Sequence, residues 1–256
     1  MAVLCGRGAP ASWPRPPRPL PCTLAPSMPP AMIKVHHLNN SRSQRVLWLL
    51  EELELPYEVI RYQRDPKTML APPELRAVHP LGKSPVVELD GQVLAESAAI
   101  IETLCERYDS GQRISPPPQP LDGEERRRYR YWLHYAEGSA MPPLLLSLVL
   151  ARIRSAPMPF FAKPVARAIA DKAMRAFVGP QLALHLGYIE SELGQREWFA
   201  GDRFTAADIQ MSFPVEAAAA RAGGERPRMQ AFVERIRARP AYQRALEKGG
   251  PYSLLS

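Results

Sequence analysis

The stretch LGKSPVVELDGQVLAESAAI, residues 81–100, constrains the fold of this chain more than any other. Apolar residues on both sides of Asp90-Gly91 predict a β-hairpin, because this dipeptide favours the tight turns that join antiparallel strands. Pro85 has no N–H group to donate to a sheet, so we expect it directly before the first strand of this hairpin and not within it. Glu96-Ser97 then opens an apolar helix. We therefore expect a strand pair that leads directly into a helix.

The residues before this stretch predict two more strands with a helix between them. MIKVHHL begins a short buried strand, and YEVIRY (57–62) alternates as a second one. SQRVLWLLEELEL places its apolar residues near helical spacing, and Pro56 ends that helix. Strand, helix and strand form a βαβ unit with a parallel strand pair. A short helix near 73–77 and a helix over 97–108 complete a small mixed sheet.

Beyond DSGQRISPPPQPLDG, a linker by composition, the sequence predicts helices only. The run PPLLLSLVLARI is strongly apolar, but it is shorter than the roughly 20 residues that cross a bilayer. We expect it to be a buried helix that lines a cleft, and not a membrane span. The predicted helices cover about residues 124–154, 165–193, 206–221, 228–237 and 241–248.

The first 31 residues hold nine of the 29 prolines, which predicts disorder or polyproline II. They contain no unbroken apolar segment of the kind found in secretory signals. Met28 and Met32 are alternative starts. Three arginines of this tail contribute to the net charge of +7, and the arginines of 126–130 follow two glutamates as on a solvated helix face. A nucleic-acid-binding protein is therefore not expected.

Three cysteines, Cys5, Cys22 and Cys105, are too few for a disulfide framework. This usage is typical of a reducing compartment, and we expect a cytoplasmic protein. His36 and His37 have no carboxylate or cysteine at metal-ligand spacing, so no metal site is expected. TAAD (205–208) has the spacing of a helix capping box, which favours a structural role.

Three motifs in this order resemble the cytosolic glutathione S-transferase family. They are NNSRSQRVLW after the first strand, HPLGKSPVVELDGQVLAESAAIIETL, and WFAGDRFTAADIQM. The similarity covers about residues 32–250. It implies an α/β thioredoxin-like N-terminal domain followed by an all-α helical-bundle C-terminal domain. The implied division is a tail (1–31), a glutathione-binding domain (32–109), a linker (110–121) and an electrophile-binding domain (122–256).

The resemblance assigns the glutathione contacts to the opening stretch. Pro85 takes the place of the family's cis-proline, which turns the backbone of Ser84 toward a peptide ligand as a strand would. Ser97 faces an anion at a helix N-terminus, and Glu96 meets a cation. Lys83 is placed to meet the glycine carboxylate. Two plainer interpretations stay open: Glu96-Ser97 as a helix cap and Lys83 as a solvated loop residue.

The reacting group is expected after the first strand, at the start of the first helix. Serine-type members carry their active serine four residues before an arginine, and this register selects Ser41 before Arg45. Ser43 is the alternative, although it is also a natural helix cap. Neither the tyrosine nor the cysteine of other classes stands here, so the chain resembles a serine-type, bacterial or fungal-like class. Arg42 between the two serines leaves the donor to the sulfur open.

The implied function is conjugation of glutathione, as co-substrate, to small hydrophobic electrophiles in detoxification. No other cofactor is implied, and a homodimer is expected. The alternatives are a non-enzymatic glutathione- or ligand-binding scaffold of the same fold and a glutathione-dependent peroxidase or isomerase. The electrophile pocket is expected between the domains, lined by the apolar residues from Met141 to Ile153 and by Tyr131, Tyr135 and Phe160.

Overall fold

A four-stranded mixed sheet forms the N-terminal half of the folded chain. The computed structural model describes residues 32–116, 123–221 and 225–252, so the tail (1–31) and part of the predicted linker lie outside the described residues. The strand order is β2-β1-β3-β4, in which β1 is parallel to β2 and antiparallel to β3, and β3 and β4 are antiparallel. The strands are β1 (Ile33–Leu38), β2 (Tyr57–Tyr62), β3 (Val86–Leu89) and β4 (Gln92–Ala95).

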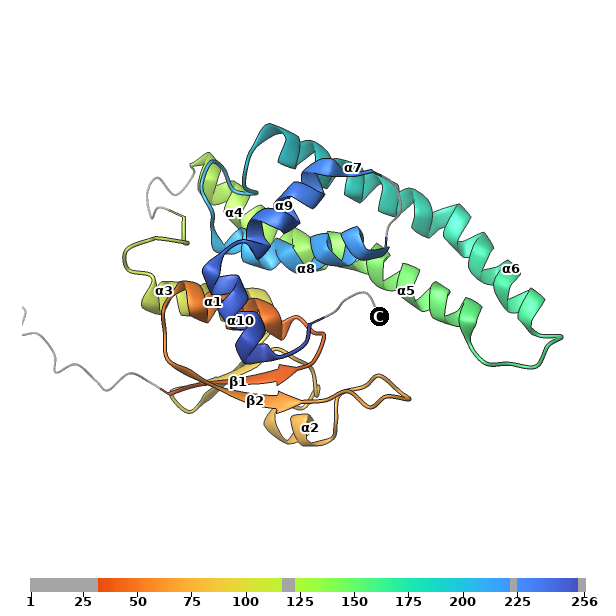
Figure 1. Ribbon diagram of the computed structural model, residues 1–256, viewed down its shortest axis with the longest axis horizontal. Coiled ribbons are helices and arrows are strands. Elements are labelled where there is room, and N and C mark those ends of the chain that lie inside the picture. The colour runs from red at the N-terminus through yellow and green to blue at the C-terminus, as the bar shows by residue number, and fades with distance from the viewer. Residues whose placement is uncertain (1–31, 117–122, 222–224, 253–256) are drawn as a thin grey trace, which may run out of the picture. The chain divides into compact units, whose positions relative to one another are not determined.

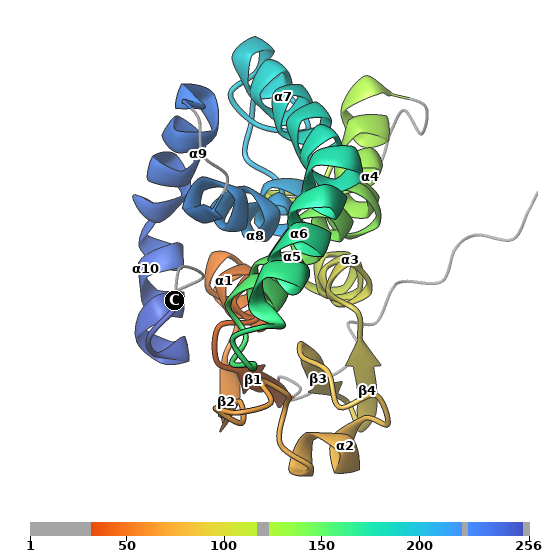
Figure 2. The same ribbon diagram turned by 90° about the vertical axis from the view of Figure 1, so that its right-hand side faces the viewer.

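This sheet confirms the predicted βαβ unit and hairpin. The hairpin turn needs two residues with positive φ, and Asp90 (51°) and Gly91 (75°) supply them. Two helices, α1 (Ser43–Glu52) and α3 (Ser97–Tyr108), lie between the sheet and the helical half, with α2 (Glu74–Val78) on the other side of the sheet (Figures 1 and 2). The thioredoxin-like arrangement follows from this order.

The C-terminal half is helical throughout the described residues, as predicted. Two long helices each contain a π-helical turn, at Ala136–Ala140 and Met174–Val178. The first of them carries the predicted apolar run. The helices are α4 (Glu124–Tyr135), α5 (Met141–Ser155), α6 (Lys163–Ala173), α7 (Gly179–Gln195), α8 (Ala206–Arg221), α9 (Pro227–Arg237) and α10 (Pro240–Gly249).

One hydrophobic core runs through both halves. Trp48 on α1 lies at its centre, and its ring centroid is 5.5 Å from that of Phe204 and 5.1 Å from that of Tyr242. Beside it, the carboxylate of Glu51 accepts hydrogen bonds from Tyr57 and Arg244. Helix α1 is therefore held by the sheet on one side and by the helical half on the other, so that its N-terminus is fixed in place.

The expectation that PPLLLSLVLARI forms a buried helix is wrong for most of its length. Only Met141, Pro143 and Leu144 of α5 are buried, whereas Leu145 is 53% exposed. Beyond Leu144, α5 packs mainly against α6 and α7, and its other face meets solvent. The continuous helix Glu124–Ser155 is long and apolar enough to cross a membrane by length and composition alone, but its α4 part buries Trp132 and Leu133 in the core.

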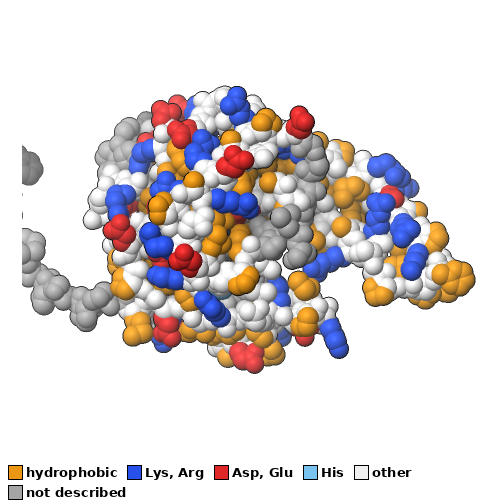
Figure 3. Space-filling model, in the orientation of Figure 1, with side chains coloured by type: hydrophobic (Ala, Val, Ile, Leu, Met, Phe, Trp, Pro, Cys, Tyr) orange, Lys and Arg blue, Asp and Glu red, His pale blue; other side chains and the backbone are white. Residues whose placement is uncertain are grey.

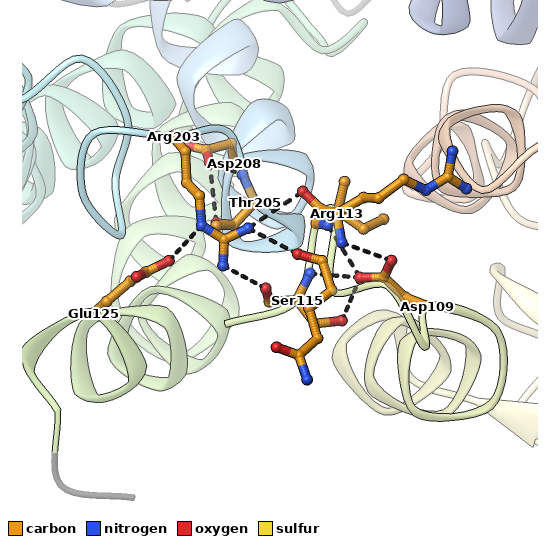
Figure 4. Close-up of polar contacts among 9 residues, drawn as sticks. Asp109, Arg113, Ser115, Glu125, Arg203, Thr205 and Asp208 are labelled. Atoms are coloured by element: carbon orange, nitrogen blue, oxygen red, sulfur yellow. Dashed lines mark hydrogen bonds and ion pairs between the residues drawn. The ribbon is translucent and has the colours of Figure 1, made fainter. Parts of the chain in front are cut away.

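Arg203 ties the segment that joins the two halves to the helical bundle (Figure 4). Its guanidinium donates to Glu125 on α4 and to the carbonyl oxygens of Gln112, Arg113 and Ser115. The Asp109 carboxylate accepts three backbone N–H groups of the same segment. We call the described part of this connection, residues 109–116, the strap; its backbone is held in place by these hydrogen bonds.

The TAAD element caps α8, as its spacing predicts. The Asp208 carboxylate accepts a hydrogen bond from the backbone N–H of Thr205 at 2.8 Å and from that of Phe199 at 2.8 Å. Both residues of the cap are fully buried. Because every one of these bonds is internal to the fold, the element stabilises the start of α8 and faces no ligand.

Candidate active site

A pocket opens where the sheet half meets the helical half. Its wall is formed by the loop before β3, by the end of β4 with the start of α3, by the residue that precedes α1 and by one residue of the first π-helical turn. Five of the residues predicted to bind glutathione come together here: Lys83, Ser84, Pro85, Glu96 and Ser97. The other lining residues are Arg42, His79, Leu81, Ala95 and Glu137.

Ser84 and Pro85 form the floor of this pocket, and the peptide bond between them is cis. The Ser84 hydroxyl donates to the carbonyl oxygen of His36 at 2.9 Å and accepts from the backbone N–H of Leu38 at 3.3 Å. Both partners belong to β1. The serine side chain is therefore anchored to the sheet.

Glu96 and Ser97 stand at the N-terminus of α3. Glu96 has φ 70° and ψ 121°, a conformation that costs a non-glycine residue on the order of 1–3 kcal/mol. Ser97 is buried, and its hydroxyl accepts a hydrogen bond from Nη1 of Arg45 at 3.3 Å. The hydroxyl proton of Ser97 is thereby free to be donated toward the pocket, next to the unpaired N–H groups of a helix start.

Arg42, just before α1, and Arg45 on α1 share one carboxylate from the helical half. Arg45, 1% exposed, places Nη1 2.5 Å from Oε1 of Glu137, and Nε of Arg42 lies 2.8 Å from Oε2. Burial opposes ionisation of Glu137, but the charges of Arg45 and Arg42 outweigh it and lower the pKa of this carboxyl. The cluster carries a net positive charge at neutral pH, and Arg42 presents it to the pocket.

A chain of hydrogen bonds leads from the pocket into the sheet. The hydroxyl of Ser41 lies 3.4 Å from that of Ser84 and 2.8 Å from that of Ser43. Ser43 in turn lies 2.9 Å from Nδ1 of His37. Both serines are buried: Ser43 faces the histidine, whereas Ser41 contacts Ser84 of the pocket wall without lining the pocket itself.

His37 is held neutral inside this chain. Burial, and then the nearby charge of Arg61, lower its pKa to about 4, against a weaker upward effect of a backbone hydrogen bond with Gly249. Gly249 lies close to the imidazole: a Cβ at that position would be only 3.4 Å from Cε1 of the ring. The end of α10 therefore takes part in orienting the ring.

No metal-binding cluster is found in the part of the chain that the structure describes. The two ring nitrogens of His36 are occupied by Tyr62 and Glu88, each at 2.9 Å.

The residues predicted to line an electrophile pocket do not line the cavity described above. Tyr131 and Tyr135 stack on each other at 5.4 Å within the aromatic cluster of α4 and α7, and the Tyr135 hydroxyl lies 2.7 Å from His185. Met141 is buried at the start of α5. Phe160 is 84% exposed in the turn after α5 and does not line this pocket. The ring contact with Tyr188 of α7 holds Tyr135 in the core, whereas Tyr131 stays 46% exposed.

Two site residues were not predicted from the sequence. Glu137 lies 92 residues from Arg45 and within a helix whose charge pattern gives no local signal. Arg42 was noted only as a bulky neighbour of the serines. Their proximity depends on how the helical half is placed against α1.

Comparison with known proteins agrees with this geometry. The family profile described as "Glutathione S-transferase, N-terminal domain" matches residues 41–107, and "Glutathione S-transferase, C-terminal domain" matches residues 149–240. "Glutathione S-transferase 3" of Schizosaccharomyces pombe is 38% identical over 219 residues, which cover 85% of this chain and 88% of that protein. The chain belongs to the glutathione S-transferase family. "Glutathione S-transferase 1" of Saccharomyces cerevisiae is 33% identical over 227 residues, covering 85% of this chain and 95% of that one.

Solved glutathione S-transferases share the fold over most of their length. A crystal structure of a glutathione S-transferase from Actinobacillus pleuropneumoniae has a TM-score of 0.70 and 32% sequence identity, covering 87% of this chain and 95% of that one. A theta-class glutathione S-transferase from Xanthomonas axonopodis pv. citri, solved with glutathione bound, has a TM-score of 0.63 and 25% identity, covering 84% and 97%. The family assignment thus rests on sequence and on fold together.

Proposed function

We propose that this member of the family binds glutathione in the pocket, ionises its thiol beside Ser41 and conjugates it to small hydrophobic electrophiles. The observation that carries the proposal is the position of Ser41. Its hydroxyl stands at the N-terminus of α1, 3.4 Å from the hydroxyl of Ser84 in the pocket floor and next to the positive charge of Arg42.

The pocket has a partner for each charged end of the tripeptide. Ser97 and the start of α3 would receive the γ-glutamyl carboxylate, and Glu96 its ammonium group. Lys83 would meet the glycine carboxylate, and the backbone of Ser84 would pair with the cysteinyl residue as a strand does. These contacts leave the thiol between Ser84 and the first turn of α1.

Ionisation of the thiol is the chemical step that the protein must assist. A free thiol has a pKa near 8.5, so only a few per cent is thiolate at pH 7. A hydrogen bond from Ser41, the N–H groups of α1 and the charge of Arg42 all favour the anion. The thiolate then attacks the electrophilic carbon, its lone pair forms the new C–S bond, and the leaving group departs with the electrons of the bond it loses.

The electrophile would bind against the first turns of α5, which continue from Glu137. Leu145 is 53% exposed and offers apolar surface there, whereas Met141 is buried. We do not extend this proposal to Tyr131 and Tyr135, because their rings are engaged in the aromatic cluster. As expected of the family, we propose a cytoplasmic homodimer with a role in detoxification.

The test is the pKa of glutathione bound to the protein, measured by titration of thiolate absorbance in the ultraviolet. Ser41→Ala should raise it by about one unit, the value of one hydrogen bond to a charged group. The rate with a chloronitrobenzene should fall about tenfold at pH 7 and recover largely at pH 9. Ser43→Ala is the matched control, because its hydroxyl faces His37 and should shift the thiol pKa little.

Three results would contradict parts of the proposal. If only Ser43→Ala shifted the pKa of the bound thiol, the hydroxyl that contacts the sulfur would be that of Ser43 and not that of Ser41. A shift with neither variant would assign the donor to backbone or to an asparagine of the same loop. A wild-type protein that binds glutathione, yet turns over neither a chloronitrobenzene nor an organic hydroperoxide, would be a binding scaffold.

A further inference from the structure

The segment from residue 145 to 178, which we call the α5–α6 arm, projects from the helical half (Figures 1 and 2). Large apolar side chains are exposed along it to an extent that is unusual for a soluble protein surface. At its tip, Phe160 is 84% exposed and Phe161 is 69% exposed. Further exposed residues of the arm are Leu146, Val149, Ile153, Val165 and Ile169.

These side chains form a face and are not scattered singly. Val165 and Ile169 are four residues apart, which places them on one side of α6, and Phe161 precedes the helix in the turn at its start. The only buried residue of α6, Ala170, attaches the helix to the rest of the fold. The apolar face therefore has no partner among the described residues, and Figure 3 shows it as hydrophobic surface at the end of the arm.

The arm is also strongly basic. It contains six basic residues and a single acid, so it accounts for +5 of the formal net charge of +7. The acid, Asp171, is already paired with Arg154 at 2.8 Å. All six basic side chains are exposed: Arg152, Arg154, Lys163, Arg167, Lys172 and Arg175.

An apolar face and an excess of positive charge together limit the kinds of partner that the arm can bind. A second copy of this chain, docked arm to arm, would cover the apolar face but bring like charges together. A bilayer with anionic lipids meets both features, since its headgroups attract the cations while phenylalanine and aliphatic side chains enter the acyl boundary. We propose that the α5–α6 arm is a peripheral docking surface for an anionic lipid bilayer, with Phe160 and Phe161 as the inserted residues.

The arm leaves the active-site pocket outside the bilayer. Glu137, at the pocket, precedes α5, whereas the phenylalanines follow its far end. The mode is association at the surface and not a span, because α4, the other end of the same helix, is held in the core. Such docking would bring the enzyme to the phase in which apolar electrophiles concentrate.

The experiment is co-sedimentation of the full chain with vesicles of phosphatidylcholine alone and of equimolar phosphatidylcholine and phosphatidylserine. We expect binding to the anionic vesicles only, weakened by high salt. Each basic residue at an anionic surface is worth about a fivefold change in partitioning, so Lys172→Glu with Arg175→Glu, which follow Ile169 at helical spacing, should lower it by at least about 25-fold. Phe160→Ser with Phe161→Ser should also abolish most of it.

The matched control is Arg130→Glu with Arg228→Glu, which changes the net charge equally at exposed positions on α4 and α9. This control should bind nearly as wild type does. Turnover without vesicles should be unchanged in every variant, which separates this proposal from the proposed active site. Equal loss in the control, or no binding by the wild type, overturns the proposal. So does a change from dimer to monomer in the phenylalanine variant by sedimentation equilibrium, since the face would then be a subunit contact.

Discussion

The Nδ1 atom of His37 lies 2.9 Å from the hydroxyl of Ser43, and that hydroxyl lies 2.8 Å from the one of Ser41. A neutral imidazole that donates through Nε2 accepts at Nδ1, so Ser43 then donates to His37 and accepts the single hydroxyl proton of Ser41, which would turn from Ser43 to the sulfur when glutathione binds. The protonation state of a buried histidine is thereby connected, through two hydroxyl groups, to the residue proposed to hold the glutathione sulfur.

This relationship predicts a loss of stability in mild acid. The folded-state pKa of His37, about 4, lies below the unfolded value near 6.5, so between these pH values only the unfolded state takes up the proton. The free energy of unfolding should fall as the pH drops from 6.5 to 4, by about 3 kcal/mol in total. Above pH 7 the histidine should contribute no pH dependence.

Urea unfolding followed by circular dichroism between pH 4 and pH 8 measures this slope. In His37→Asn, which keeps an acceptor near Nδ1, the part of the slope between pH 6.5 and 4 should disappear whatever the stability at pH 7. A slope that persists in the variant would assign the acid sensitivity to carboxylates.

Loss of Glu96 and Ser97 should abolish glutathione binding without unfolding the protein. The double variant Glu96→Ala with Ser97→Ala removes the partners proposed for both charges of the γ-glutamyl group, and each charged hydrogen bond is worth roughly 1.5–3 kcal/mol. Retention on immobilised glutathione should be lost, with the circular dichroism spectrum unchanged. Glu102→Ala with Thr103→Ala, which changes the charge equally on the same helix, should be retained; normal retention of the first variant would reject the site.

Removal of the carboxylate of Glu137 should destabilise the fold strongly. Arg45 is 1% exposed and would keep a buried charge without its counter-ion, at a cost of about 3–5 kcal/mol in the free energy of unfolding. Glu137→Gln should show this loss in urea unfolding. The double variant Glu137→Met with Arg45→Met should be more stable than Glu137→Gln, because the charge left without its counter-ion is then only that of Arg42, which is 34% exposed to water. Additive losses from the two positions would show that the pair is not coupled.

Arg203→Ala should release the strap that joins the two halves. The substitution removes hydrogen bonds to three carbonyl oxygens and to Glu125, and we expect a loss of about 2 kcal/mol. Hydrogen exchange should speed up at Ala206, whose N–H donates to the carbonyl oxygen of Ile114 in that strap. Arg196→Ala, which breaks an exposed pair with Glu124, is the control and should cost under about 1 kcal/mol. Similar losses in both variants would contradict a special role for Arg203.

The sequence alone determined the elements whose signals are local. Asp90-Gly91 sets the hairpin because its positive φ values are required by the turn itself, and the start of α3 at Ser97 follows from the next residues. The family motifs located five residues that the fold then brings to one pocket. Each of these features depends on residues within a few positions of one another, which is the range over which turn and helix preferences act.

Only the tertiary structure decided which surfaces are covered and which charges meet. A helical period shows that α5 has an apolar face, but the placement of α6 and α7 determines that much of it stays exposed. The same placement buries Tyr135 and brings Glu137 to Arg45 across 92 residues. Burial and long-range ion pairs are set by which elements pack together, and this is a property of the whole chain that no local pattern contains.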